Sequence, residues 1–183
     1  MLSSAKNVRE LVEAMEVRFL ANPDANLRFA LLTDFVDAPE ETLPEDAHLL
    51  RVAQDAVSSL NAKYRGAQPG DHADGRGDIF FLLHRPRLWN PGERQWMGYE
   101  RKRGKLAALN ALLTGEESAT KRYSAVVGDV AALAGIRYVI TLDSDTEFPR
   151  DTAHQLIGAM AHPLNRPRFD ERKGRVTTGY GIL

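Results

Sequence analysis

The sequence predicts an α/β fold with a largely parallel sheet. Apolar runs of strand length alternate along the chain with longer segments in which apolar residues recur every three or four positions. Such alternation is typical of strand–helix–strand units, whose two strands run parallel. The chain has 183 residues, of which 43% are apolar, enough to bury one sizeable core. We therefore expect residues 1–183 to belong to one domain.

Four segments have the helical period. Val8, Val12 and Phe19 recur along one face of the first segment, and Pro44 suits the first turn of the second. The expected helices are 7–20, 42–66, 99–115 and 150–162.

Five shorter segments are rich in apolar β-forming residues. The expected strands are 27–35, 79–85, 123–128, 137–142 and 174–183. Residues 67–78 (AQPGDHADGRGD) have the composition of a loop, and residues 86–98 are expected to be irregular. The chain opens on a helix with no strand before it and stops within a strand pattern. We therefore expect the sheet to be incomplete at both ends.

Composition excludes several classes of function. The formal net charge is −1, so no global field favours nucleic acid or an anionic membrane. There are no cysteines, which excludes disulfides, zinc–cysteine sites and thiol chemistry. The apolar runs are far shorter than the roughly 20 residues that cross a bilayer. As given, the chain is expected to be soluble.

The segment RYVITLDSDT (137–146) is the strongest candidate for a chemical site. Asp143 and Asp145 follow an expected buried strand, and ligands of open parallel sheets bind beyond the carboxyl ends of the strands. The two-residue period sends both carboxylates to one side, where they repel unless a cation lies between them. A hard divalent ion such as Mg²⁺ or Mn²⁺ accepts such ligands and bridges them to substrate phosphates.

Two other interpretations are open, one for the Asp-x-Asp motif and one for the basic residues 84–105. Phosphatases of the haloacid dehalogenase class also place Asp-x-Asp after an apolar strand, with Asp143 then the nucleophile. Their pattern requires Thr or Val where this chain has Glu147, which weakens that interpretation. The other interpretation is a basic module that binds nucleic acid or an acidic partner, with Trp89, Trp96 and Tyr99 as stacking surfaces.

A basic segment precedes and enters the third expected helix. From His84 to Lys105 there are seven Arg or Lys residues and two Glu, a net charge of +5 in an otherwise acidic chain. Basic side chains at a helix N-terminus can hold phosphate together with backbone N–H groups. Asp34 lies at the end of the expected strand 27–35. Its carboxylate could accept hydrogen bonds from ribose hydroxyls or from a base N–H, although a capping role fits equally well.

The motifs GKLAALN (104–110) and VITLDSDT (139–146), in this order, resemble those of processive GT-A glycosyltransferases, the group of cellulose and chitin synthases. The match is closer to the glycosyltransferase domain of bacterial cyclic β-1,2-glucan synthases. It rests on FALLTDF, on the long run from FFLLHRPRLWNP to NALLTG, on the segment that begins YVITLDSDTEFPRD, and on GRVTTGYGIL. The resemblance covers nearly the whole chain.

The resemblance implies the donor-side part of a GT-A domain, a Rossmann-like nucleotide-diphospho-sugar fold. The parent would transfer glucose from UDP-glucose to a glucan acceptor with inversion, using Mg²⁺ or Mn²⁺. Asp143 and Asp145 would bind the metal, and Asp34, Lys105, Asp143 and Asp145 would bind the nucleotide sugar.

The same resemblance implies limits on what this chain does alone. The base that deprotonates the acceptor and the acceptor motif would lie after Leu183, so no catalytic residue is assigned and the fragment is expected to be inactive. The parent would act at the cytoplasmic face of the bacterial inner membrane. The open sheet edges could pair copies of the fragment.

Overall fold

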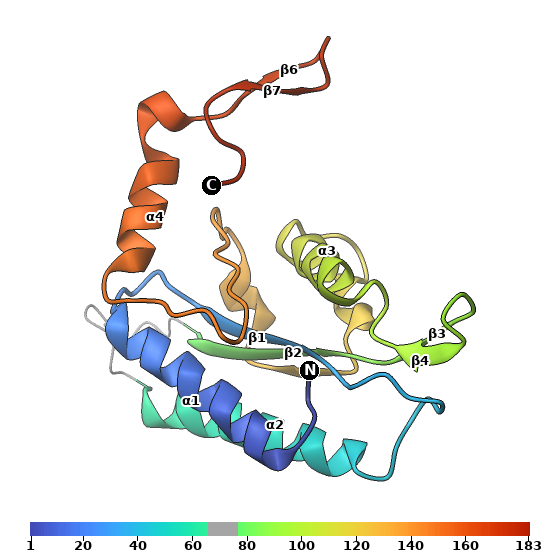
Figure 1. Ribbon diagram of the computed structural model, residues 1–183. Coiled ribbons are helices and arrows are strands. Elements are labelled where there is room, and N and C mark those ends of the chain that lie inside the picture. The colour runs from blue at the N-terminus through green and yellow to red at the C-terminus, as the bar shows by residue number, and fades with distance from the viewer. Residues whose placement is uncertain (66–76) are drawn as a thin grey trace.

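The chain forms the expected α/β architecture, seen in a computed structural model that describes residues 1–65 and 77–183 (Figure 1). The expected loop 67–78 lies almost wholly outside these ranges. The helices are α1 (Ala5–Ala21), α2 (Asp46–Lys63), α3 (Arg101–Leu113) and α4 (Thr152–Ala161). The strands are β1 (Phe29–Asp34), β2 (Phe80–Arg85), β3 (Leu88–Asn90), β4 (Gln95–Met97), β5 (Ala125–Val127), β6 (Arg168–Asp170) and β7 (Arg175–Thr178).

The central sheet is small and mixed, with strand order β1–β2–β5. β1 and β2 run parallel, and their register places Asp34 opposite Arg85. β5 pairs antiparallel with β2, so the expected largely parallel sheet is only partly right. A parallel pair needs a crossover connection, and α2 supplies it between β1 and β2. The connection from β2 to β5 is different, since it contains the β3–β4 hairpin, α3 and a short 3-10 helix, Ala119–Arg122.

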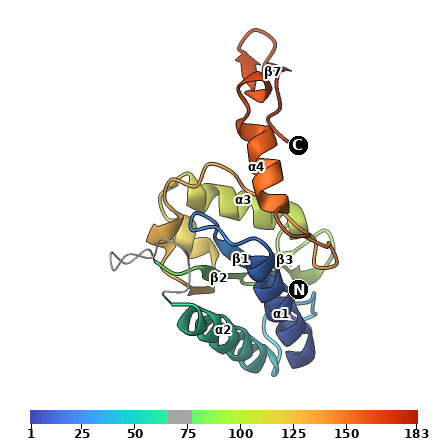
Figure 2. The same ribbon diagram turned by 90° about the vertical axis from the view of Figure 1, so that its left-hand side faces the viewer.

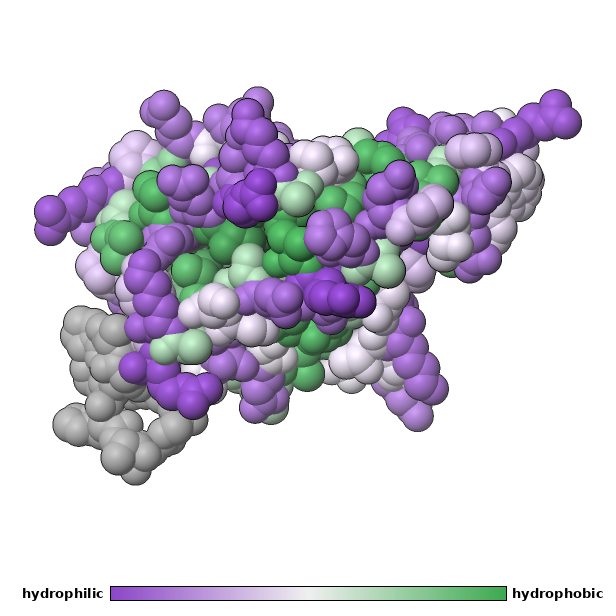
Figure 3. Space-filling view, turned by 90° about the horizontal axis from the view of Figure 1, so that it is seen from below, coloured by the Kyte–Doolittle hydropathy of each residue, from purple (hydrophilic) through white to green (hydrophobic). Residues whose placement is uncertain are grey.

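Helices cover both faces of this sheet. On one face α1 and α2 pack side by side, with Val8, Met15 and Phe19 of α1 against Val57 and the strand residues (Figures 1 and 2). On the other face α3 packs Ala108 and Leu109 against Leu83. β2 is therefore buried along its whole length, as its continuous apolar sequence predicts. Seen from the side of α1 and α2, hydrophobic surface remains in the middle of the molecule, with hydrophilic side chains around it (Figure 3).

The prediction of a strand at 137–142 is wrong. This segment has no regular secondary structure, and Tyr138 and Val139 are 40% and 46% exposed. Its composition favours a strand, but a strand also needs backbone hydrogen bonds to a neighbour. Where the structure is described, neither edge of the central sheet pairs with this segment.

The prediction of an irregular segment at 86–98 is only partly right. β3 and β4 form a hairpin in which Trp89 lies opposite Trp96, with ring centroids 5.9 Å apart. Trp96 also exchanges two backbone hydrogen bonds with Ala38, of 2.8 and 2.9 Å, which anchors the hairpin to the loop after β1.

The C-terminal part extends away from the central sheet (Figures 1 and 2). Asn22 is buried just after α1. Its Oδ1 accepts a hydrogen bond from the N–H of Ala153 at 3.0 Å, and its Nδ2 donates one to the carbonyl of Pro149 at 3.3 Å. These two bonds fix the start of α4. The strand expected at 174–183 is confirmed at its beginning as β7, which pairs with β6. Within the two described ranges, no helix is both long and apolar enough to cross a membrane.

Candidate functional site

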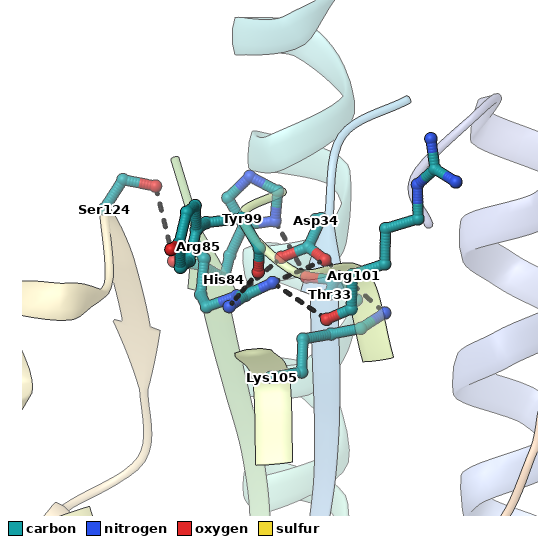
Figure 4. Close-up of polar contacts among 8 residues, drawn as sticks. All are labelled: Thr33, Asp34, His84, Arg85, Tyr99, Arg101, Lys105 and Ser124. Carbon is teal, nitrogen blue, oxygen red and sulfur yellow. Dashed lines mark hydrogen bonds and ion pairs between the residues drawn. The ribbon is translucent and has the colours of Figure 1, made fainter. Parts of the chain in front are cut away.

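A buried ion pair lies at the carboxyl ends of the two parallel strands. Asp34 ends β1 and Arg85 ends β2, and both are less than 10% exposed. The Arg85 guanidinium donates from Nε to Asp34 Oδ1 at 2.8 Å and from Nη2 to Oδ2 at 3.0 Å (Figure 4). This bidentate contact gives each carboxylate oxygen a hydrogen bond. A buried charge is stable only when it is paired and hydrogen-bonded in this way.

Arg85 also fixes the start of α3. Its remaining N–H groups donate to the backbone carbonyls of Tyr99 at 3.1 Å and Arg101 at 3.2 Å (Figure 4). Two glycines make room for this arrangement: a Cβ at Gly98 would lie 2.5 Å from Asp34, and one at Gly104 would lie 2.0 Å from the Tyr99 carbonyl oxygen. The ion pair and the backbone around the first turn of α3 therefore form one packed unit.

Two lysines on α3 reach two different aspartates. Lys105 Nζ lies 3.6 Å from Asp34 Oδ2, and its side chain is 19% exposed. Lys102, one turn earlier on the same face, places Nζ 2.7 Å from Asp143 Oδ1. This second pair is more than half exposed on both sides, so water screens it and it contributes little to stability. The geometry nevertheless brings Asp34, Lys105, Lys102 and Asp143 along one helix face.

Asp143 and Asp145 lie on a turn rather than at the end of a buried strand. The N–H of Thr146 donates to the carbonyl of Asp143 at 3.1 Å, and both aspartates are exposed. From α1, the Arg18 guanidinium donates to the carbonyls of Thr146 at 2.9 Å and Ser144 at 3.4 Å. Arg18 thus ties this turn to the body of the molecule through backbone atoms and leaves both carboxylates at the surface, where a ligand can reach them.

A cavity of about 890 Å³ opens beside these residues. One wall is β1, from Phe29 to Thr33, and the opposite wall is the segment 135–144. Lys102, Lys105 and Asp143 are among its charged lining residues, together with Arg18, Asp24 and Arg137, and most of the lining is apolar. A mostly apolar hollow with some charged groups is the usual form of a small-molecule site.

Among residues 1–65 and 77–183, no group of three or more His, Asp or Glu side chains is placed to hold a metal ion. The two carboxylates of the 143–146 turn offer oxygen ligands, one of them paired with Lys102. Mg²⁺ is commonly bound by one or two carboxylates together with substrate phosphates and water. This donor set therefore fits a metal that arrives with a diphosphate, and does not fit a metal caged by protein alone.

His84 is a neutral, buried member of the same layer. Its Nδ1 lies 2.8 Å from Thr33 Oγ1, and its Nε2 has no hydrogen-bond partner within the described ranges (Figure 4). Burial lowers the pKa of His84 from 6.5 to about 4, although the nearby Asp34 and Asp46 carboxylates act in the opposite direction. His84 therefore carries no charge at neutral pH, which suits a packing role beside Phe35.

The sequence motifs point to Asp34 and Lys105, which the fold brings together, and to Asp143 and Asp145, which lie on one turn. They do not single out Arg85 or Lys102 within the basic segment 84–105, because composition does not reveal which basic residue faces which aspartate. Nothing in the sequence distinguishes Arg18, since its contacts are to backbone atoms more than 120 positions away.

The chain is related along its whole length to a known enzyme. All 183 residues align, at 43% identity, with the cyclic β-(1,2)-glucan synthase NdvB of Rhizobium meliloti (strain 1021). The chain spans about 6% of the length of that protein. No protein-family model matches the chain. The resemblance expected from the sequence motifs is therefore confirmed: the chain is homologous to a segment of a glucan synthase, a glycosyltransferase.

Proposed function

We propose that this chain forms the donor-binding part of a glycosyltransferase that makes β-1,2-glucan from UDP-glucose. The observation that carries the proposal is the pair of α3 contacts, Lys105 to Asp34 and Lys102 to Asp143, in a chain 43% identical to a glucan synthase. One helix face thereby connects the end of a parallel strand with the Asp-x-Asp turn, over a cavity wide enough for a nucleotide sugar.

In this proposal each residue group has a defined task. Lys102 and Lys105, which line the cavity, neutralise the diphosphate. Asp143 and Asp145 hold a divalent ion, Mg²⁺ or Mn²⁺, that shares the phosphate oxygens. When bound, such an ion stabilises the negative charge on the departing UDP. Asp34, which is buried and held by Arg85, takes part in nucleotide binding by positioning Lys105 at the uridine side.

The parallel β1–β2 pair with helices on both faces is consistent with part of a GT-A domain, which we propose as the fold of the larger unit. An inverting transfer also needs a base for the acceptor hydroxyl. We propose that this base lies outside these 183 residues, so we expect the isolated chain to bind donor without transferring glucose. In the larger protein, we propose that the donor site lies at the cytoplasmic face of the inner membrane.

Calorimetric titration of UDP in the presence and absence of Mn²⁺ tests the proposal. We expect Mn²⁺-dependent binding by the wild-type chain and at least about tenfold weaker binding by Asp145→Asn, because one oxygen ligand of the metal is lost. Asp145 is exposed, so this change should leave the fold intact. Asp55→Asn is the matched control, since Asp55 is exposed on α2 and lies away from the site.

Two results would contradict the proposal. One is equal UDP affinity for the wild type and Asp145→Asn, which would remove the Asp-x-Asp turn from the site. The other is binding that ignores Mn²⁺ and falls steeply with salt, which would favour a basic module for polyanions instead.

A further inference from the structure

A second, smaller cavity lies on the side of α3 that faces away from the proposed donor site. Its volume is about 370 Å³, and among the described residues the two cavities have no lining residue in common. α3 contributes Lys102 and Lys105 to the first cavity but Gly104 and Ala108 to the second. At 3.6 residues per turn these two pairs lie on opposite faces of the helix. The second cavity is therefore a separate site.

The second cavity is bordered by exposed apolar and aromatic side chains. Leu88 of β3 and Tyr99, which lies between β4 and α3, both line it and are 49% and 56% exposed. Large apolar groups exposed together beside a hollow are a feature of binding surfaces. The residues of α3 that line the cavity have small side chains, which leave room for a ligand: Gly104, Ala107 and Ala108.

The backbone that carries Tyr99 is held in place. Its carbonyl accepts a hydrogen bond from Arg85 Nη1 at 3.1 Å, and Arg85 is itself buried against Asp34. The next two residues, Glu100 and Arg101, have φ angles of 52° and 45°. Non-glycine residues rarely adopt this left-handed conformation, which costs free energy and persists only where the surroundings impose it. The turn thus presents Tyr99 at a fixed point on the edge of the second cavity.

The polar groups of the second cavity include both hydrogen-bond donors and an acceptor. Four of its lining residues are charged: Arg85, Glu100, Lys121 and Arg122. Three of these charges are balanced by ion pairs, since Arg85 pairs with Asp34, Glu100 with Arg103, and Arg122 with Glu116. Guanidinium and ammonium groups donate, whereas the Glu100 carboxylate accepts. This mixture at nearly balanced charge suits a neutral ligand with many hydroxyls better than it suits a polyanion.

We propose that the second cavity binds a stretch of glucan chain, with the Tyr99 ring stacked on one face of a glucose unit. This inference rests on the proposed function as part of a glucan-making enzyme. A glucose ring has apolar C–H groups on its faces and hydroxyls around its edge, so it matches an aromatic ring flanked by donors and an acceptor. Because α3 separates the two cavities, the site holds the chain away from the point of transfer.

Calorimetric titration with linear β-1,2-linked gluco-oligosaccharides, without UDP or Mn²⁺, tests the proposal. We expect the wild-type chain to bind with a Kd on the order of 1 mM. Tyr99→Ala should weaken binding by about fivefold or more because the stacked ring is lost, and Tyr99→Phe, which keeps the ring, should stay within about twofold of the wild type. Tyr180→Ala is the matched control, since Tyr180 is 50% exposed and lies outside both cavities.

A second variant tests the polar side of the cavity without changing Tyr99. Lys121 is exposed on the short 3-10 helix, so Lys121→Ala should leave the fold intact. We expect it to weaken oligosaccharide binding by about threefold, because one hydrogen-bond donor to a hydroxyl is removed. Wild-type binding should change little when the salt concentration is raised, since the ligand carries no charge.

The proposal is overturned if the wild-type chain does not bind the oligosaccharide at millimolar concentration, or if Tyr99→Ala and Lys121→Ala both bind as the wild type does. Equal losses in Tyr99→Ala and Tyr99→Phe would exclude stacking. Tighter binding of an oligonucleotide, with an affinity that falls steeply with salt, would make this a polyanion site instead. UDP and Mn²⁺ are absent from these titrations, so a failure here is distinct from a failure of the donor site.

Discussion

Gly104, the fourth residue of α3, has no room for a side chain. A Cβ at this position would lie 2.0 Å from the carbonyl oxygen of Tyr99 and 2.7 Å from Nη1 of Arg85. The first of these neighbours is backbone, so rotation of a side chain cannot relieve the contact. Gly104→Ala must therefore displace either the start of α3 or the guanidinium that holds Asp34.

The magnitude follows from three contributions. Overpacking a filled site costs about 1–3 kcal/mol, and the backbone contact places this case near the upper end. Loss of the hydrogen bond from Arg85 to Tyr99 destabilises the fold by about 1 kcal/mol more. The higher helix propensity of alanine offsets this destabilisation by up to about 1 kcal/mol. We expect Gly104→Ala to lower the free energy of unfolding by about 3 kcal/mol, which lowers Tm by about 6–12 °C in a chain of this size.

Urea unfolding followed by circular dichroism measures this change, with Gly158→Ala as the control. Gly158 lies in α4, is exposed, and has no atom within 4 Å of the position that an alanine methyl group would take. There the same substitution should raise the free energy of unfolding by about 0.5–1 kcal/mol. Equal effects of the two substitutions, or a stabilising Gly104→Ala, would refute the packing of Arg85 beneath α3.

Two further changes probe the same sheet. His84 stays neutral in the folded chain down to a pKa of about 4, whereas the unfolded chain takes up a proton near pH 6.5, so stability falls by about 3 kcal/mol as pH drops through this window. Urea unfolding at pH 7 and pH 4.5 should show this loss in the wild type but not in His84→Gln. His48→Gln, at an exposed position, is the control and should lose stability as the wild type does. Equal losses of stability in all three proteins would contradict a neutral buried His84. Asn61 of α2 bonds three backbone groups at Ile79 and Phe80, so Asn61→Ala should lower the free energy of unfolding by about 2–4 kcal/mol, and a thermal scan matching wild type would show that these bonds contribute nothing.

The sequence was sufficient to predict an element and its buried face where the local pattern of apolar residues matches the packing of that element in the fold. The apolar run of β2 predicts a strand buried on both faces, and Leu82 and Leu83 do pack into cores on opposite sides. The period of Val8, Val12 and Phe19 predicts the buried face of α1 for the same reason: side-chain spacing reports which face meets the core. Asp34, at the end of such a strand, could be proposed as a site residue from its position alone.

Tertiary structure decided what depends on a partner from elsewhere in the chain. Residues 137–142 have the composition of a strand, yet they form none because composition cannot supply a hydrogen-bonded neighbour. Arg85 holds both carboxylate oxygens of Asp34, because the parallel register sets the ends of β1 and β2 side by side. Periodicity and propensity thus determined most helices and strands. The edge of the sheet and the site depend on which strands and side chains pair, and pairing is a property of two segments rather than one.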